Sequence, residues 1–173
     1  TMMANHLHKR LDTKEWSISI VDRSDRHLYQ PGFLFLPFGI YGESDIVRAT
    51  RDYLPHGVDF IQAEVGTITP DSHTVTLKDG RTIMYDVLII ATGCRIAPEE
   101  TQGMLGPKWR DNIHDFYTLD GARALCDKLA EWKGGRLVVH INEMPVKCPV
   151  APLEFSFLAD TFFREKGMRD RVC

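Results

Sequence analysis

The hydrophobic pattern of the first 22 residues predicts a helix followed by a strand. Apolar side chains recur at the spacing that places them on one face of a helix, namely at Met2, Met3, Leu7 and Leu11. Over 16–22 (WSISIVD) apolar residues alternate with serines, which is the pattern of a half-buried strand. No cap or turn precedes the helical pattern, so we expect the loop before this helix to lie outside the sequence.

The next segment, 29–42 (YQPGFLFLPFGIYG), is rich in aromatic residues, proline and glycine. Its prolines and glycines oppose a regular helix, so we expect a long apolar loop that covers either core or a flat ligand. Residues 45–54 then predict a short helix, because Ser44 can cap its start and Pro55 would end it.

Short strands dominate the pattern that follows. We expect them over 58–62, 64–69, 74–78 and 82–84. Asp79-Gly80 is typical of a tight hairpin turn between the last two. The run 86–93 (DVLIIATG) is continuously apolar and ends in small residues, which predicts a strand buried on both faces of a parallel sheet.

The second half of the chain alternates helix and strand after a mixed, glycine- and proline-containing linker. We expect a helix over 118–132, a buried strand over 136–141 and a helix over 152–166. Helices alternating with strands in this way indicate an α/β fold, here with two parallel sheets begun and neither completed.

Composition excludes several classes of protein. The chain has 173 residues, of which 43% are hydrophobic, and a net charge of -3, so it is neither disordered nor strongly basic. Because basic residues are scattered among acidic ones, we expect no nucleic-acid partner. No apolar run approaches the roughly 18 residues of a membrane span, and the opening segment lacks the basic and apolar regions of a signal peptide. The cysteines and histidines form no metal-binding spacing.

Two features of the first half of the chain suggest a dinucleotide site. Asp22 ends a predicted strand, where an acid can accept hydrogen bonds from the ribose hydroxyls of a dinucleotide, although it also fits an ordinary solvated loop. The small residues Ala91, Thr92 and Gly93 would let a bulky ligand approach the backbone. A simple strand-ending turn would explain those three residues equally well.

Cys148 carries the sharpest chemical signal. It lies within 145–152 (PVKCPVAP), between a predicted strand and a predicted helix, and it follows Lys147. The positive potential of a helix N-terminus and of Lys147 favours the thiolate, and the flanking prolines fix the direction of the sulfur. These are the conditions for a redox or nucleophilic cysteine; the alternative, a buried structural cysteine, fits Cys126 better.

The predicted strand at 136–141 lacks the glycine-rich turn that binds a pyrophosphate. The residues after it, 142–147 (NEMPVK), include bulky side chains and a proline ring. A G-x-G-x-x-G sequence would instead place backbone amides and a helix N-terminus against the phosphates. We therefore expect that this half does not bind NAD(P)H.

Four segments together resemble the sulfide:quinone oxidoreductase family, to which flavocytochrome c sulfide dehydrogenase is related. They are Ser19–Asp22, the loop beginning Tyr29-Gln30-Pro31-Gly32, Tyr85–Gly93 and Lys147–Pro152. The resemblance implies tandem Rossmann-like (FAD/NAD(P)-binding) domains, both incomplete here, with a small β-excursion in the first. It implies a partial FAD-binding domain over 1–98, a linker over 99–116 and the start of a degenerate, non-NAD-binding domain over 117–173.

The family's chemistry transfers to individual residues. Cys148 matches the redox cysteine of the K-C-x-x-A-P motif. The implied FAD contacts are Asp22 with Arg23 beside it, the loop residues Gln30 and Pro31, the adenine contact Val65, and Ala91, Thr92 and Gly93. The resemblance implies that sulfide is oxidised through this cysteine and FAD, and that quinone accepts the electrons.

One departure and several expectations accompany this resemblance. Many members have a further cysteine where this chain has Tyr117, and we expect the redox partner of Cys148 beyond residue 173. The quinone pocket and membrane contacts would also lie outside the chain, which we expect to be inactive alone. We expect a peripheral membrane protein of a prokaryotic cell. Whether it forms a homo-oligomer is left open.

Two alternatives remain from the residues alone. One is a related flavoprotein of the same superfamily that takes electrons from NAD(P)H. The other is a non-catalytic α/β fragment in which the apolar loop 29–42 serves as an interaction surface.

Overall fold

The computed structural model describes residues 1–173, which form two compact units. The first unit contains Thr1–Leu28 and Val47–Gly93, and the second contains Tyr29–Ile46 and Cys94–Cys173. Each unit is therefore built from two separate stretches of chain. The domain ranges expected from the sequence, 1–98, 99–116 and 117–173, stay a prediction.

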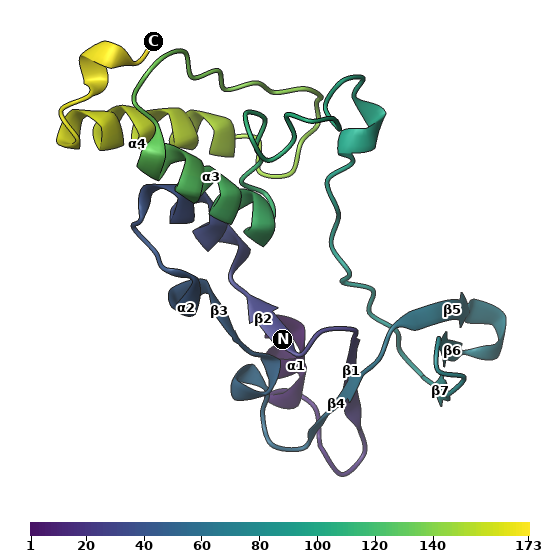
Figure 1. Cartoon of the computed structure of the whole chain (residues 1–173). Helices are drawn as coiled ribbons and strands as arrows, with labels where there is room; N and C mark the ends of the chain where they lie inside the picture. Colours follow the sequence, from purple (N-terminus) through teal and green to yellow (C-terminus); the bar gives the residue numbers. More distant parts are fainter. The chain divides into compact units, whose positions relative to one another are not determined.

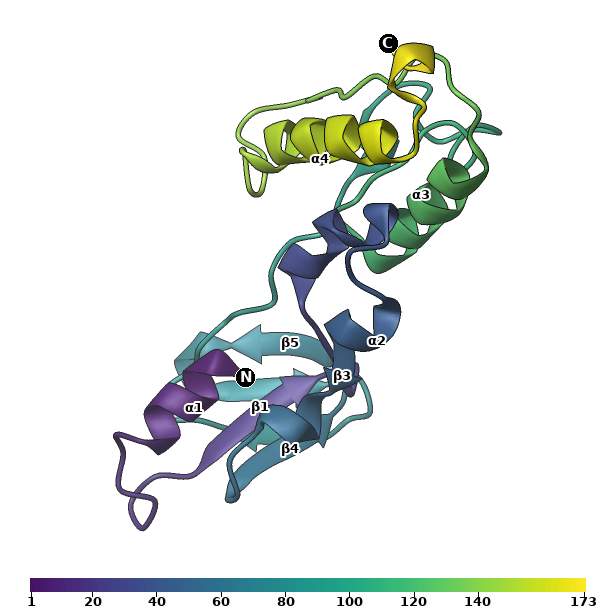
Figure 2. The same cartoon turned by 90° about the vertical axis from the view of Figure 1, so that its left-hand side faces the viewer.

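The first unit contains a parallel strand pair with a helix packed beside it. β1 (Ile18–Asp22) pairs with β4 (Val58–Gln62) from Ile18 opposite Val58 to Asp22 opposite Gln62. α1 (Met2–His8) lies against β1, as Figure 2 shows, and buries Ala4. Parallel strands with a helix on their face form an α/β unit, so this part of the predicted fold is confirmed.

A second strand pair replaces most of the helix predicted over 45–54. α2 (Glu43–Ile46) has only four residues, because the chain continues directly into β3 (Val47–Ala49). β3 pairs antiparallel with β2 (Arg26–Leu28), a strand that the hydrophobic pattern did not predict. A 3-10 helix over Thr50–Tyr53 completes the segment. Strand pairing thus outweighs the local helical preference.

The predicted β-excursion is a three-stranded antiparallel sheet (Figure 1). Its strands are β5 (Val65–Thr69), β6 (Thr74–Leu77) and β7 (Thr82–Met84). Gly80 adopts a φ of 91° in the turn before β7, a conformation that glycine adopts without strain. The hairpin predicted around Asp79-Gly80 is confirmed.

Two predicted strands are wrong, namely those within 86–93 and over 136–141. Both segments lack strand structure, and most of their apolar side chains are exposed, with 66% for Val87, 65% for Ile90 and 70% for Val138. A strand needs a neighbouring strand to bond its N–H and C=O groups. Continuous hydrophobicity indicates burial but does not by itself supply that neighbour.

The second unit packs two helices against two short 3-10 helices. α3 (Leu119–Glu131) and α4 (Ala151–Glu165) lie close to the positions predicted for them. The 3-10 helices are Gln30–Leu34 and Leu36–Phe38. The buried core cluster comprises Leu34, Phe38, Leu125, Leu129, Phe155, Ala159 and Phe163. The apolar segment 29–42 was predicted to cover either core or a flat ligand, and through Leu34 and Phe38 it covers core.

Candidate functional site

Asp22 lies at the carboxyl end of the parallel strand pair. Its backbone carbonyl accepts a hydrogen bond from the Ala63 N–H at 2.9 Å, and its Oδ1 accepts one from the Ser24 N–H at 2.9 Å. The residue is exposed, and a carboxylate can accept several further hydrogen bonds. The carboxyl edge of parallel strands is where α/β folds bind nucleotides, so the placement suits a ribose-binding acid.

Val65 and Arg23 lie near the same edge of the first unit. Val65 begins β5 just after β4 ends, and its side chain is 37% exposed. Glu64 forms an ion pair with Lys78 at 2.6 Å; the hydrogen bond and charge of Lys78 lower the pKa of Glu64, and the charge of Arg23 lowers it further. Three of the predicted cofactor residues are thus brought to one edge.

The segment Ala91–Gly93 is exposed and has no regular secondary structure. Gly93 has a φ of +72°, which favours glycine, and a Cβ added there would meet nothing within 4 Å. Its backbone is accessible to a ligand. A role for Ala91, Thr92 and Gly93 against the flavin stays a prediction.

In the second unit, the segment that contains Gln30 and Pro31 contacts the loop at 145–152, which contains Cys148 and is called the redox loop. Gln30 begins a 3-10 helix with Pro31 in its first turn. The Gln30 Oε1 accepts a hydrogen bond from the Lys147 Nζ, next to Cys148. The two segments are 117 positions apart, and the hydrophobic pattern placed them in separate elements.

Cys148 is exposed and its thiol is free. It lies in the loop before α4 and adopts a left-handed backbone with a φ of 54°. Its carbonyl accepts two hydrogen bonds, from the Ala151 N–H at 3.0 Å and from the Tyr117 hydroxyl at 3.3 Å. The backbone of Cys148 is therefore tied to the start of α4 and to the residue that precedes the N-cap of α3.

Sequence reasoning missed this contact of Tyr117. Burial raises the pKa of the Tyr117 hydroxyl, and the charge of the nearby Cys148 raises it further. The Tyr117 N–H donates to the Asp115 Oδ1 at 3.0 Å. The only local signal was the capping residue Thr118, which indicates a helix start but says nothing about a contact 31 positions away.

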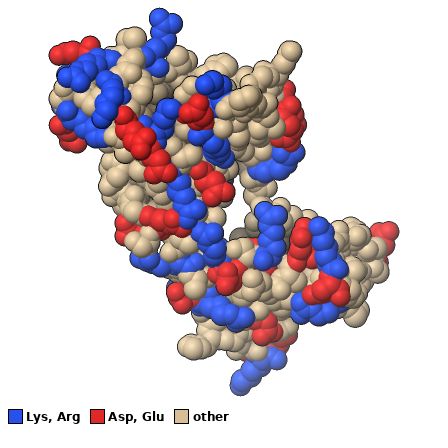
Figure 3. All heavy atoms as spheres, in the orientation of Figure 1, with Lys and Arg blue, Asp and Glu red and all other residues tan.

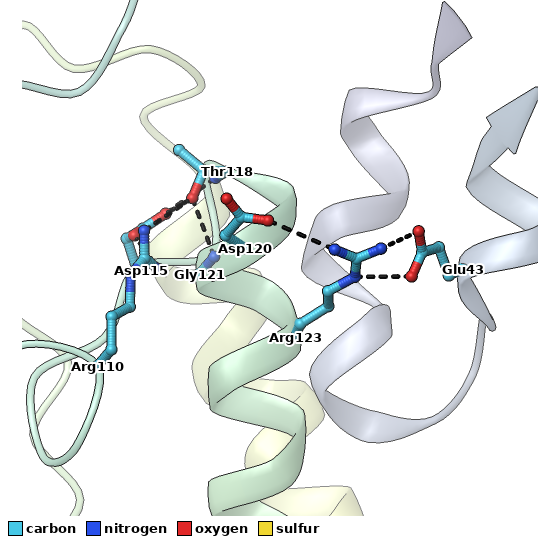
Figure 4. A network of polar contacts seen from close by, with 7 residues as sticks. All are labelled: Glu43, Arg110, Asp115, Thr118, Asp120, Gly121 and Arg123. Carbon is cyan, nitrogen blue, oxygen red and sulfur yellow. Dashed lines mark hydrogen bonds and ion pairs between the residues drawn. The ribbon is translucent and has the colours of Figure 1, made fainter. Parts of the chain in front are cut away.

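A polar network fixes the start of α3 (Figure 4). The Asp115 Oδ1 accepts hydrogen bonds from the Thr118 N–H and hydroxyl, both at 2.9 Å, and its Oδ2 pairs with the Arg110 Nη1 at 2.6 Å. The Thr118 Oγ1 in turn accepts the Gly121 N–H at 3.0 Å. This network holds Tyr117 between Asp115 and the N-cap of the helix.

Charged side chains of both signs are interspersed on the face shown in Figure 3. Several are paired, including Arg81 with Asp79 at 2.7 Å. No group of histidine, cysteine and acidic side chains has the arrangement of a metal site. None of the helices has the length and apolar character that crossing a bilayer requires.

Comparison with known proteins found no matching family model. The mitochondrial sulfide:quinone oxidoreductase of Mus musculus is 30% identical over 170 residues, which cover 98% of this chain and 37% of that protein. The mitochondrial sulfide:quinone oxidoreductase of Dictyostelium discoideum is 27% identical over 171 residues, 98% of this chain and 38% of that protein.

A solved structure has the same fold. It is the sulfide:quinone oxidoreductase of the hyperthermophilic bacterium Aquifex aeolicus, with a TM-score of 0.73 and 22% identity, covering 98% of this chain and 38% of that chain. The Rossmann-like α/β fold predicted from the sequence is confirmed.

The comparisons correct one prediction and confirm another. The expectation of a prokaryotic cell is wrong, because the relatives from Mus musculus and Dictyostelium discoideum are mitochondrial proteins of eukaryotes. The chain spans 38% or less of the length of these curated relatives. The family resemblance is confirmed: this chain is homologous to the sulfide:quinone oxidoreductases along 98% of its length.

Proposed function

We propose that this chain is the part of an FAD-dependent sulfide:quinone oxidoreductase that contacts the adenosine half of the cofactor and carries the redox cysteine. One observation carries the proposal, namely similarity over 98% of the chain to proteins named sulfide:quinone oxidoreductase. The geometry of Asp22 and Cys148 agrees with it, since each is exposed in a position that suits its proposed role.

The residues at the carboxyl edge of β1 and β4 fit the adenosine half of FAD. Asp22 would accept hydrogen bonds from the ribose hydroxyls, and Val65 would contact the adenine through its backbone. The positive charge of Arg23 near this edge would favour an anionic cofactor. FAD would supply a carrier that accepts two electrons and passes them on.

Cys148 would accept the sulfur of sulfide in a new S–S bond, which forms as two electrons leave the sulfur atoms. Sulfide loses two electrons in this reaction, and the quinone takes up those two electrons together with two protons to become a quinol. The exposed thiol of Cys148 can reach a small anion, and the adjacent Lys147 supplies positive charge that attracts it. Quinones dissolve in lipid, so we propose contact with a membrane surface.

The test uses the full-length gene product, purified with its flavin under anaerobic conditions. Sulfide should bleach the flavin absorbance, and Cys148→Ser should abolish that bleaching. The matched control is Cys94→Ser, which changes another exposed cysteine of the second unit outside the redox loop and should leave bleaching intact. Bleaching of the Cys148→Ser protein at the unaltered rate would overturn the role of this cysteine.

A second arm tests the cofactor and the electron donor. Asp22→Ala should lower the flavin content of the purified protein, because it removes the acceptor for the ribose hydroxyls. Rapid reduction of the flavin by NADH would favour the alternative of an NAD(P)H-dependent flavoprotein.

A further inference from the structure

We propose that Tyr117 is a positioning residue for Cys148, because its hydroxyl donates to the Cys148 carbonyl and fixes the backbone that directs the thiol. This inference rests on the proposed redox role of Cys148. Tyr117 touches the carbonyl of that residue, so it acts on the reacting sulfur through the backbone.

The backbone of Cys148 needs such a restraint. Its φ of 54° lies in the left-handed region, which residues with a side chain adopt at a cost and keep only where the surroundings hold them. The carbonyl of Cys148 is held by the Ala151 N–H on one side and by the Tyr117 hydroxyl on the other. Loss of either donor would let the peptide rotate and turn the thiol with it.

Tyr117 is itself held firmly enough to act as an anchor. Its N–H donates to Asp115, and its ring stacks on Phe116, with ring centroids 5.2 Å apart. Phe116 stacks in turn on Phe155 of α4, at 4.8 Å and an angle of 5°. The hydroxyl therefore extends from a packed aromatic group, so a change in the redox loop cannot readily displace it.

The protonation state of Tyr117 suits a hydrogen-bond donor. Burial and the charge of Cys148 raise its pKa above the usual value of 10.0, so the hydroxyl keeps its proton through the neutral and mildly alkaline range. A second contact restrains the same loop one residue before Cys148, where Lys147 donates a hydrogen bond to Gln30. Tyr117 and Lys147 together would confine the loop to one conformation.

The first measurement is amide hydrogen exchange at Ala151 in the full-length gene product. Tyr117→Phe removes only the hydroxyl, and loss of one neutral hydrogen bond should speed exchange at Ala151 by roughly 2- to 10-fold. The matched control is Tyr41→Phe, which removes a hydroxyl in the same unit from a ring that packs on Phe35. Equal exchange rates in the two variants would overturn the inference.

The second measurement separates positioning from mere stability. Tyr117→Phe should lower kcat for sulfide oxidation several-fold while the KM for quinone stays unchanged, and Tyr41→Phe should change neither. Faster exchange at Ala151 with an unchanged kcat would show the hydrogen bond but overturn its positioning role. If Cys148→Ser retains sulfide oxidation, the redox role of Cys148 fails, and the exchange data still report separately on the Tyr117 contact.

Discussion

Replacement of Gly121 by alanine should destabilise the protein, although alanine is the better helix former. Gly121 lies in the first turn of α3, beside the network of Arg110, Asp115 and Thr118 (Figure 4). A Cβ at Gly121 would come within 2.1 Å of the Arg110 Nη1 and 2.4 Å of both Asp115 carboxylate oxygens. These atoms are the ends of side chains, so they would move away and give up their present contacts.

The size of the effect follows from what Asp115 would lose. Its carboxylate accepts hydrogen bonds from Tyr117 and Thr118 and pairs with Arg110. A hydrogen bond to a charged group contributes about 1.5–3 kcal/mol, and we count the loss of one. Alanine in place of glycine inside a helix raises the free energy of unfolding by about 1 kcal/mol. The free energy of unfolding should therefore fall by about 0.5–2 kcal/mol.

The assay is urea unfolding followed by far-ultraviolet circular dichroism, with Gly121→Ala compared with the unaltered protein. The midpoint should move to lower urea while the slope stays constant. In an Asp115→Ala background the carboxylate is absent and Arg110 has lost the ion pair that holds its Nη1 near Gly121, so its side chain can move away at little cost. The same substitution should then be neutral or stabilising by up to about 1 kcal/mol. An increase of about 1 kcal/mol from Gly121→Ala alone would refute the reasoning.

Three further outcomes are expected elsewhere. Phe163→Ala should lower the free energy of unfolding by about 3–5 kcal/mol, because this ring is only 1% exposed; a loss below about 1 kcal/mol in urea unfolding would contradict its place in the core. Burial raises the pKa of Cys126, so iodoacetamide should modify it more slowly than exposed Cys148 at neutral pH, as peptide mass spectrometry would show. Hydrogen bonds from Arg164 and Arg169 lower the pKa of Asp160 below 3.8. The stability that these contacts give the folded protein is therefore present above pH 3.8 and lost as the pH falls through the lowered pKa. Arg164→Ala should raise the pKa of Asp160, as an NMR titration of its carboxyl group would show.

The helices of the second unit were predictable because their signals are local. The predicted ranges 118–132 and 152–166 differ by one residue at each end from α3 (Leu119–Glu131) and α4 (Ala151–Glu165). Thr118 caps α3 by accepting the Gly121 N–H, an interaction that a reader of the sequence can anticipate from spacing. The β-hairpin at Asp79-Gly80 follows from equally local turn chemistry.

The wrong predictions share a physical cause, since each depends on a partner that is distant in the sequence. Residues 47–49 pair with the strand at 26–28, so the local helical preference of 45–54 does not decide their structure. The run at 86–90 has the composition of a buried strand but has no neighbour to bond its backbone. Composition reports a tendency to be buried, and pairing decides the conformation.

The residues of the candidate site differ in the same way, since some could be predicted from local sequence and one could not. Cys148 and Asp22 were identifiable because each carries its chemistry in one side chain within a short motif. Tyr117 was seen in the sequence only as a residue that stands where a cysteine was expected, because its contact depends on the packing of Phe116 against α4. A motif therefore identifies the groups that could react, whereas the group that holds Cys148 in its left-handed conformation emerges only when α3 and α4 are packed together.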